Sequence, residues 1–303
     1  MSTLVEIAPD EYDPAAFKEF RPSASGFEIA NARALMWFSQ LAYETHRTAT
    51  IEATSQLWEF KSVVPFIKHK SRLNGSFETC GLIGERADSV ILAFAGTDPG
   101  IWQNLATDFT PLPQAGSDIH SGFQLAAVAA KSEIKQAARL SQQSQIPLFI
   151  AGHSLGAALA ALAAQTVLGE ATPLRAVYTF GMPRVGGERF AARYDADLGA
   201  LTYRLVNGID LVARVPPSFV GFRHVGRVLQ CEAGAKFDDK PLSPIGSDDP
   251  PFDEQLPNIF RRDVSNVLSG SILSPSGPAP LVYFLDFFHP KSAIICRIPT
   301  GKH

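Results

Sequence analysis

The stretch FIAGHSLGAALAA, residues 149–161, decides how the rest of the chain is interpreted. It predicts an apolar strand, a tight turn at Ser154 and a helix of small residues. Residues 152–156 match the pattern G-x-S-x-G, in which a sharp strand-to-helix turn presents a serine as a nucleophile. Glycine at 152 and 156 removes side chains that would clash where the helix packs beside the strand. We therefore predict that Ser154 is a nucleophile; the alternative is a turn serine that caps a buried helix.

The pattern by itself is modest evidence, because it arises by chance in roughly one chain of this length in ten. A nucleophilic serine also needs a base, an acid that orients the base, and donors for an oxyanion. The other segments of the chain must supply these groups.

The segments on both sides of this turn alternate between strands and helices, which predicts a mostly parallel sheet with helices on both faces. Buried strands are predicted within 89–100, 147–152, 175–187, 200–217 and 223–233, and helices within 27–46 and 122–144 and after Ser154. Residues 1–26 are predicted to be a loosely structured lead-in. Residues 236–280, rich in Pro, Asp and Ser, predict a long loop excursion. That excursion is either a surface insertion or part of the roof of a substrate pocket.

The composition fits one large α/β domain over residues 1–303, since 46% of the residues are hydrophobic and 19% are charged. A net charge of −3 without long charged runs argues against nucleic-acid binding. The cysteines Cys80, Cys231 and Cys296 lie far apart and form no metal or redox motif. They predict reduced thiols, with one disulfide plus a free thiol as the alternative, and we expect no metal or organic cofactor.

No apolar stretch approaches the ~20 residues of a membrane span. The nearest, residues 272–288, is interrupted by prolines and Asp286. The acidic start MSTLVEIAPDEYD differs from the basic and then apolar pattern of a signal peptide. We therefore expect no transmembrane segment. The compartment stays open between the cytoplasm and export with removal of a signal.

Thr97 is the candidate oxyanion residue, because it directly follows the apolar run VILAFAG at 90–96. The second donor in such sites comes from a loop after an earlier strand, beside the N–H of the residue that follows the nucleophile. The expected donors are thus the backbone N–H groups of Thr97 and Leu155, each worth about 10²–10³ in rate. The alternative for Thr97 is an ordinary residue at a strand end.

The acid is predicted to be Asp210, at the end of the strand within 200–217, since parallel sheets gather their sites at the carboxyl ends of strands. The alternative role for Asp210 is a turn residue next to Gly208. Asp195 and Asp197 lie in a charged, helix-like piece and are predicted to be solvated.

The base is the histidine that follows the acid in the α/β-hydrolase order of nucleophile, acid and base. Of the seven histidines, His224 and His289 satisfy this order and precede the chain terminus. His153 adjoins Ser154 and cannot reach the hydroxyl of its own neighbour productively. We predict His289, in a late loop, as the base, with His224 as the alternative or as a structural histidine.

Together these segments resemble the class 3 lipase family of α/β-hydrolases, the group of fungal-type lipases. The resemblance extends over roughly residues 30–300. The matching pieces, in chain order, are FAGT, NLATDF, IHSGF, AGHSLGAALA, YTFGMPRVGG, RLVNGIDLVARVPP, HVG and FFHP.

This resemblance implies an α/β-hydrolase fold with a Ser154–His289–Asp210 triad and an oxyanion hole at Thr97 and Leu155. It also implies a lid at residues 98–118, where Ile101, Trp102 and Leu105 give an apolar face at near-helical spacing. The alternative is a fixed helix packed on the core. Asp108 and His120 would support the site without taking part in the chemistry.

The implied activity is hydrolysis of carboxylic esters, as a triacylglycerol lipase or esterase. The implied partner is a lipid or other ester substrate, bound at a lipid–water interface. A phospholipase, thioesterase or feruloyl-type esterase with the same triad is the alternative within the enzymes. A catalytically silent hydrolase-fold module that binds lipid or protein is the alternative of another class.

Overall fold

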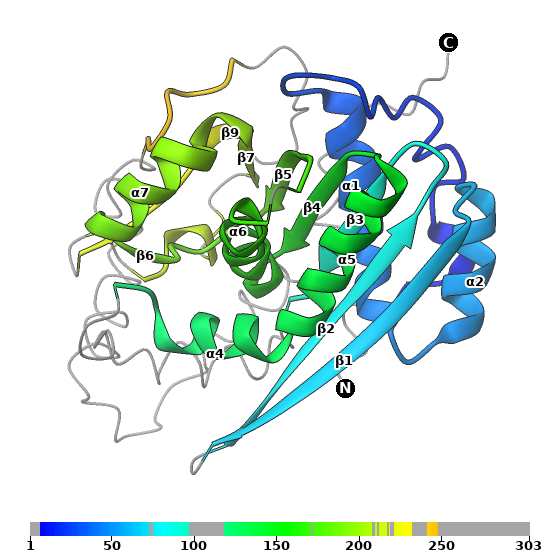
Figure 1. Ribbon diagram of the computed structural model, residues 1–303, viewed down its shortest axis with the longest axis horizontal. Coiled ribbons are helices and arrows are strands. Elements are labelled where there is room, and N and C mark those ends of the chain that lie inside the picture. Colours follow the sequence, from blue (N-terminus) through cyan, green and yellow to red (C-terminus); the bar gives the residue numbers. More distant parts are fainter. Residues whose placement is uncertain are drawn as a thin grey trace, which may run out of the picture.

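The computed structural model of the protein describes residues 7–72, 75–96, 118–170, 172–207, 210, 212–216, 218, 221–231 and 241–247 (Figure 1). The helices, strands and contacts of the fold are those of these residues.

A seven-stranded sheet, in the order β1-β2-β3-β4-β5-β7-β9, forms the centre of the described fold. Its strands are β1 (Ser62–Arg72), β2 (Gly75–Glu85), β3 (Val90–Phe94), β4 (Leu148–His153), β5 (Leu174–Phe180), β7 (Thr202–Asn207) and β9 (Arg227–Cys231). From β3 to β9 all neighbours are parallel, whereas β1 and β2 form an antiparallel hairpin. The strands β6 (Gly186–Gly187) and β8 (Phe222–Arg223) form a separate pair. The predicted, mostly parallel sheet is therefore confirmed.

Helices cover both faces of this sheet (Figure 1). The α-helices are α1 (Ile29–Leu41), α2 (Thr48–Leu57), α4 (Ser121–Ala129), α5 (Lys131–Ser144), α6 (Leu155–Leu168) and α7 (Glu188–Leu198). The 3-10 helices are η1 (Pro9–Glu11), η2 (Ala42–Glu44), η3 (Gly199–Leu201) and η4 (Val212–Arg214).

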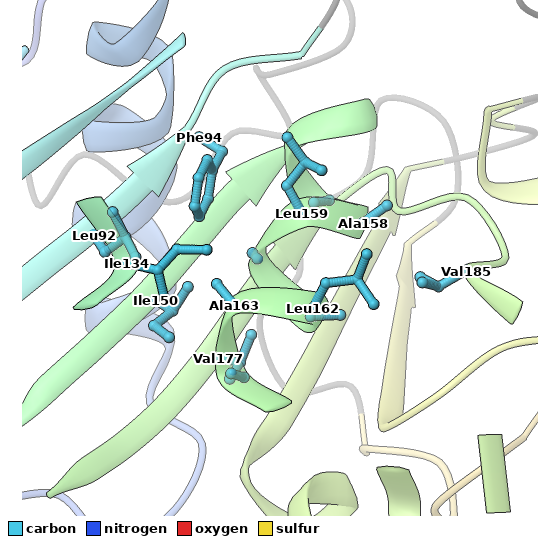
Figure 2. Packing of buried hydrophobic residues seen from close by; sticks show 14 of the residues in the cluster. Leu92, Phe94, Ile134, Ile150, Ala158, Leu159, Leu162, Ala163, Val177 and Val185 are labelled. Atoms are coloured by element: carbon cyan, nitrogen blue, oxygen red, sulfur yellow. The ribbon is translucent and has the colours of Figure 1, made fainter. Parts of the chain in front are cut away.

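The two faces of the sheet build two separate apolar clusters, because successive side chains of a strand point to opposite faces. On β4, Ile150 joins the cluster under α4 to α7, while its neighbour Phe149 joins the cluster under α1. Figure 2 shows the first cluster, with Leu159 of α6 near Phe94 of β3 and Leu162 further along the same helix. The helix α6 is buried almost all round, which explains its Ala-rich sequence.

The lead-in before α1 is more ordered than the sequence predicts. Tyr12 and Phe17 are buried, and the indole nitrogen of Trp58 donates to the carbonyl oxygen of Asp13. Phe17 packs edge-on against Phe38 and Phe60. The prediction of a loose segment was wrong for this part, because its aromatic side chains complete the cluster under α1.

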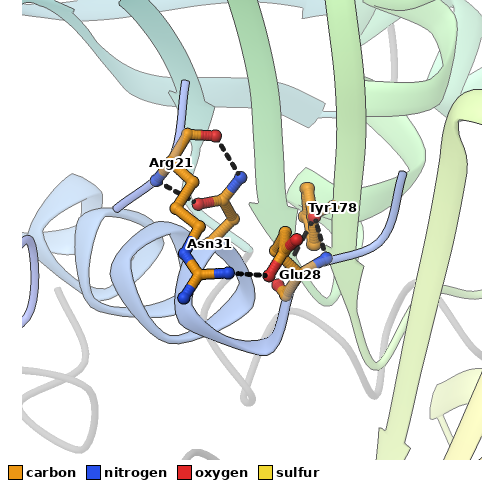
Figure 3. Close-up of polar contacts among 4 residues, drawn as sticks. All are labelled: Arg21, Glu28, Asn31 and Tyr178. Atoms are coloured by element: carbon orange, nitrogen blue, oxygen red, sulfur yellow. Dashed lines mark hydrogen bonds and ion pairs between the residues drawn. The ribbon is translucent and has the colours of Figure 1, made fainter. Parts of the chain in front are cut away.

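Polar contacts bind the end of the lead-in to α1 and the sheet (Figure 3). The backbone N–H of Arg21 donates to the side chain of Asn31, whose amide donates back to the Arg21 carbonyl. Arg21 also forms an ion pair with Glu28, and the Glu28 N–H donates to the hydroxyl of Tyr178 on β5. The start of α1 is therefore fixed against β5.

Two further differences concern regular elements. The single helix predicted within 122–144 is two helices, α4 and α5, which are separated at Ala130, where φ is −91° and ψ is 9°. The hairpin of β1 and β2 was not predicted. Only residues Gly81–Glu85 of β2 pair with β3, so the hairpin extends past the sheet (Figure 1).

The described part of the predicted loop excursion, residues 241–247, lies along β9. The N–H of Ser243 donates to the Val228 carbonyl, and the Val228 N–H donates to the Ser243 hydroxyl. The N–H of Gly246 donates to the carbonyl of Gly226, just before β9 begins. This part of the excursion therefore packs at the amino end of β9; the rest lies outside the described residues.

Candidate active site

Ser154 occupies the turn between β4 and α6, as predicted. Its φ is 56° and its ψ is −126°, a backbone conformation that side-chain-bearing residues rarely adopt. The Ser154 N–H donates to the carbonyl oxygen of Phe180 at the end of β5 over 2.9 Å. Ser154 is 5% exposed. The strand, sharp turn and helix of a nucleophile elbow are therefore present.

The glycines on either side of Ser154 allow this turn, for the reason that the sequence predicts. A Cβ atom placed on Gly152 would lie 2.2 Å from the carbonyl oxygen of Gly156. A Cβ atom placed on Gly156 would lie 2.3 Å from the carbonyl oxygen of Phe94 on β3. A side chain at either position would push α6 away from the strands.

Leu155 is the first residue of α6, a helix of 14 residues. The N–H groups of a first helical turn have no acceptor within their own helix, and the aligned peptide dipoles make this end positive. The backbone amide of Leu155 therefore lies in a position suited to an anion beside Ser154.

Gly96 approaches Ser154 from the other side. A Cβ atom placed on Gly96 would lie 2.9 Å from the Cβ of Ser154 and 3.0 Å from the carbonyl oxygen of His153. The chain after β3 thus passes directly beside the candidate nucleophile. The next residue, Thr97, lies outside the described residues, as do Ile101, Trp102 and Leu105 of the predicted lid and Asp108.

Asp210 lies at the carboxyl end of the sheet, next to Gly181. Its Oδ2 would lie 2.5 Å from a Cβ atom placed on Gly181, whose φ is +59°. Its Oδ1 accepts the N–H of Val212 over 2.9 Å. The Ser154 N–H donates to the Phe180 carbonyl, and Asp210 lies beside Gly181. Both residues therefore border the peptide bond that joins Phe180 to Gly181 at the end of β5.

The other two aspartates lie elsewhere. Asp197 is exposed, as predicted. Asp195 is half-buried and accepts the Gly226 N–H over 2.6 Å, so the prediction of a solvated side chain was wrong for it. Burial raises the pKa of Asp195, and the Gly226 hydrogen bond and the charge of Arg204 oppose this shift. Asp195 thus secures the turn before β9.

The histidines that the structure describes occupy different surroundings. His224 is buried, and its Nε2 lies 2.7 Å from the carbonyl oxygen of Ala213. A carbonyl oxygen only accepts, so this nitrogen carries the proton. His120 is buried beside Phe123 and Phe222, with ring centroids 4.6 Å and 6.1 Å away. His289, the predicted base, lies outside the described residues.

Sequence reasoning missed one side chain at this site, that of Tyr43. Its hydroxyl oxygen lies 2.7 Å from Nδ1 of His153. Burial lowers the pKa of His153 to about 4, so the imidazole is neutral near pH 7. Tyr43 ends a predicted helix far from the serine in sequence, and no local pattern singles it out.

The described residues contain neither a helix that could span a membrane nor a cluster of metal-ligating side chains. None of the described helices combines the length and apolar character that crossing a membrane requires. In the same part of the chain, no group of three or more His, Cys, Asp or Glu side chains could hold a metal ion. Cys80 and Cys231 are free thiols, and Cys296 lies outside the described residues.

Comparison with known sequences gives a match to the family model described as Lipase (class 3), over residues 93–220. The chain is 35% identical over 134 residues to the secreted mono- and diacylglycerol lipase 1 of Fusarium solani. This match covers 43% of the present chain and 39% of the Fusarium protein, so it spans about two fifths of that relative. The predicted resemblance to class 3 lipases is confirmed.

Solved structures of fungal lipases share the fold. The native propeptide complex of the Rhizomucor miehei lipase has a TM-score of 0.57 at 20% identity and covers 81% of this chain and 84% of that one. A triacylglycerol lipase, whose catalytic centre is described as a serine protease triad, has a TM-score of 0.53 at 25% identity. That match covers 68% of this chain and 81% of the other. The predicted α/β-hydrolase fold is confirmed.

Proposed function

We propose, from the match of residues 93–220 to the class 3 lipases, that this chain hydrolyses carboxylic esters of lipids through an acyl-enzyme. We further infer that residues 1–303 form one hydrolase domain. The name of the Fusarium relative points to acylglycerols as the substrate class. The same relative is described as secreted, which favours export for this protein.

In the proposed mechanism the Ser154 hydroxyl attacks the ester carbonyl carbon while His289 takes its proton. Asp210 accepts the hydrogen bond of the imidazole and holds it in the required tautomer. The negative oxygen of the tetrahedral intermediate binds the backbone N–H groups of Thr97 and Leu155. His289 then gives the proton to the leaving alcohol, and the acyl group stays on Ser154.

Water completes the cycle by attacking the acyl-enzyme, with His289 again accepting the proton. A second tetrahedral intermediate collapses, the fatty acid leaves, and the proton returns to Ser154. These steps need no redox change and no further reactant.

The backbone of Ser154 carries this proposal. Its φ of 56° is an unusual conformation for a serine, and two functional neighbours border it. Gly96, which precedes the proposed oxyanion donor, packs on its Cβ. The Ser154 N–H donates to the carbonyl oxygen of Phe180, and Asp210 lies beside the next residue, Gly181. An ordinary turn serine would need none of this arrangement.

The first experiment measures hydrolysis of p-nitrophenyl esters from acetate to palmitate by the wild type, Ser154→Ala and Ser39→Ala. Ser39 is a suitable control because it is a buried serine whose hydroxyl donates within α1, to Leu35. We expect activity in the wild type and in Ser39→Ala, and loss of at least about 10⁴-fold in Ser154→Ala. An inactive wild type, or full activity in Ser154→Ala, would refute the proposal.

The same series separates a lipase from an esterase for soluble substrates. A lipase prefers long acyl chains and gains activity when its substrate aggregates, whereas an esterase for soluble substrates prefers acetate and shows no such gain. The proposed lid at 98–118 predicts that Trp102→Ala weakens this gain. A binding module without catalysis would bind lipid vesicles and hydrolyse none of the esters.

A further inference from the structure

A polar cluster lies directly behind Ser154, around the hydroxyl of Tyr43. Tyr43 belongs to η2, the short helix after α1. Its oxygen lies 2.7 Å from Nδ1 of His153, the residue before Ser154, and the two rings are 5.9 Å apart between centroids. This contact connects the end of α1 with the elbow across 110 residues of sequence.

The same hydroxyl fills the space beside Gly96. A Cβ atom placed on Gly96 would lie 2.4 Å from the Tyr43 oxygen, closer than any real contact. The backbone of Gly96 lowers the pKa of Tyr43, against the larger effect of burial. Gly96 therefore packs closely against both Tyr43 and Ser154.

Burial determines the charge of the two side chains in this cluster. It lowers the pKa of His153 to about 4 and raises the pKa of Tyr43 well above its usual value. Both side chains are therefore neutral near pH 7. The Tyr43 hydroxyl can donate to Nδ1 of His153 or accept from it, depending on which ring nitrogen of His153 carries the proton.

We propose that Tyr43 is a positioning residue, which holds Gly96 against the elbow and so fixes the backbone at Gly96 relative to the nucleophile. This inference rests on the proposed function, in which the Thr97 amide, next after Gly96, binds the oxyanion. Tyr43 itself acts through Gly96 and His153 and touches no reacting atom. A displacement of about 1 Å at such a donor can cost about 100-fold in rate.

The direct test is Tyr43→Phe, which removes the hydroxyl and keeps the ring. The oxyanion exists in the transition state and not in the bound ester, so a misplaced donor lowers kcat and leaves KM nearly unchanged. We expect kcat to fall about 10- to 100-fold, less than the loss of a donor itself.

The matched control is Tyr194→Phe. Tyr194 on α7 is also buried, and its hydroxyl lies 2.9 Å from Oγ1 of Thr202. This variant loses a buried hydrogen bond away from Ser154 and should keep the wild-type kcat. Equal kcat values in the two variants would overturn the inference.

A second pair of variants tests the hydrogen bond between Tyr43 and His153. His153→Asn keeps a hydrogen-bonding group close to the position of Nδ1, whereas His153→Leu removes it. We expect the Asn variant to retain several-fold more of the wild-type kcat than the Leu variant. If Leu is tolerated as well as Asn, the contact does not position the site.

Hydrogen exchange separates a failure of this inference from a failure of the proposed function. In Tyr43→Phe, backbone amides of the peptide that contains Gly96 should exchange faster than in the wild type, while Tyr194→Phe leaves them unchanged. An inactive wild type would refute the proposed function and still allow this measurement. Unchanged exchange at Gly96 in Tyr43→Phe would overturn the inference whatever the activity.

Discussion

The turns before and after β4 each contain a residue with a positive φ angle, but the two residues adopt it for different reasons. Gln145, before the strand, has a φ of 54° and a ψ of 34°, the left-handed conformation that ends α5. Ser154, after the strand, has a φ of 56° and a ψ of −126°. The first conformation closes many helices and costs little. The second is costly for any residue with a side chain, and it persists only where the surroundings impose it.

The difference teaches where this molecule stores backbone strain. At Gln145 the chain simply leaves a helix, and its N–H donates to Gln142. At Ser154 the close approach of α6 to β3, through Gly152 and Gly156, determines the turn. Of the two turns, the more costly conformation therefore lies at the end of β4 where the proposed chemistry takes place.

The largest expected effect is on catalysis, at the strained end. Asp210→Asn keeps the shape of the side chain that borders Gly181 and removes its charge. Because the acid holds the base in its tautomer, we expect kcat to fall by about 10⁴ with little change in the melting temperature. Asp197→Asn, at an exposed site on α7, is the control. A loss of less than about tenfold in Asp210→Asn would remove Asp210 from the mechanism.

The next effect is on stability, through the packing that imposes the turn. Gly156→Ala places a methyl group 2.3 Å from the carbonyl oxygen of Phe94. We expect the free energy of unfolding in urea to fall by about 2–3 kcal/mol, with loss of ester hydrolysis. Gly169→Ala, at the other end of α6, meets nothing within 4 Å and should leave both unchanged or slightly improved. Similar costs for the two variants would contradict the packing argument.

A smaller effect compares the two positive φ angles directly. Ser154→Gly relieves a conformation that costs about 1–3 kcal/mol, and it should raise the free energy of unfolding by about 1 kcal/mol while abolishing activity. Gln145→Gly relieves less, and glycine adds flexibility to the unfolded chain, so we expect a change below about 0.5 kcal/mol. Urea unfolding of both variants shows which substitution raises the free energy of unfolding more. A larger increase in Gln145→Gly than in Ser154→Gly would contradict the assignment of the greater strain to Ser154.

The smallest effect is a pH dependence. Burial lowers the pKa of His153 from 6.5 to about 4, so between these values the unfolded chain binds more protons than the folded one. Stability must therefore fall as the pH drops through this window, and it rises again towards neutral pH. His153→Asn should make this slope shallower than that of the wild type. Identical slopes in the two proteins would show that His153 is not kept neutral by burial.

The sequence predicted those parts of the site that depend on short-range geometry. The G-x-S-x-G pattern predicted the turn at Ser154, because glycine is required wherever strand and helix backbones touch. The position of Asp210 at the end of its strand followed from the rule for parallel sheets. Both rest on local pattern and chain order, which a sequence contains.

Contacts between distant segments could not be predicted in this way. Tyr43 meets His153 only because α1 crosses the sheet beneath β4, and no spacing in the sequence reports that crossing. The order of the lead-in depends in the same way on a match between Phe17 and Phe60. The break at Ala130 escaped prediction because the residues on both sides favour helix.

The segment that runs along β9 bears on how the protein stays separate from its neighbours in solution. An outer strand with unused backbone groups is a template on which another chain can pair. Here the Ser243 N–H donates to the Val228 carbonyl, and the Ser243 hydroxyl accepts the Val228 N–H. The Gly246 N–H donates to the Gly226 carbonyl. The loop thus takes some of the hydrogen-bonding positions, at the amino end of β9, through which copies of the chain would join edge to edge, and its contribution would be resistance to aggregation.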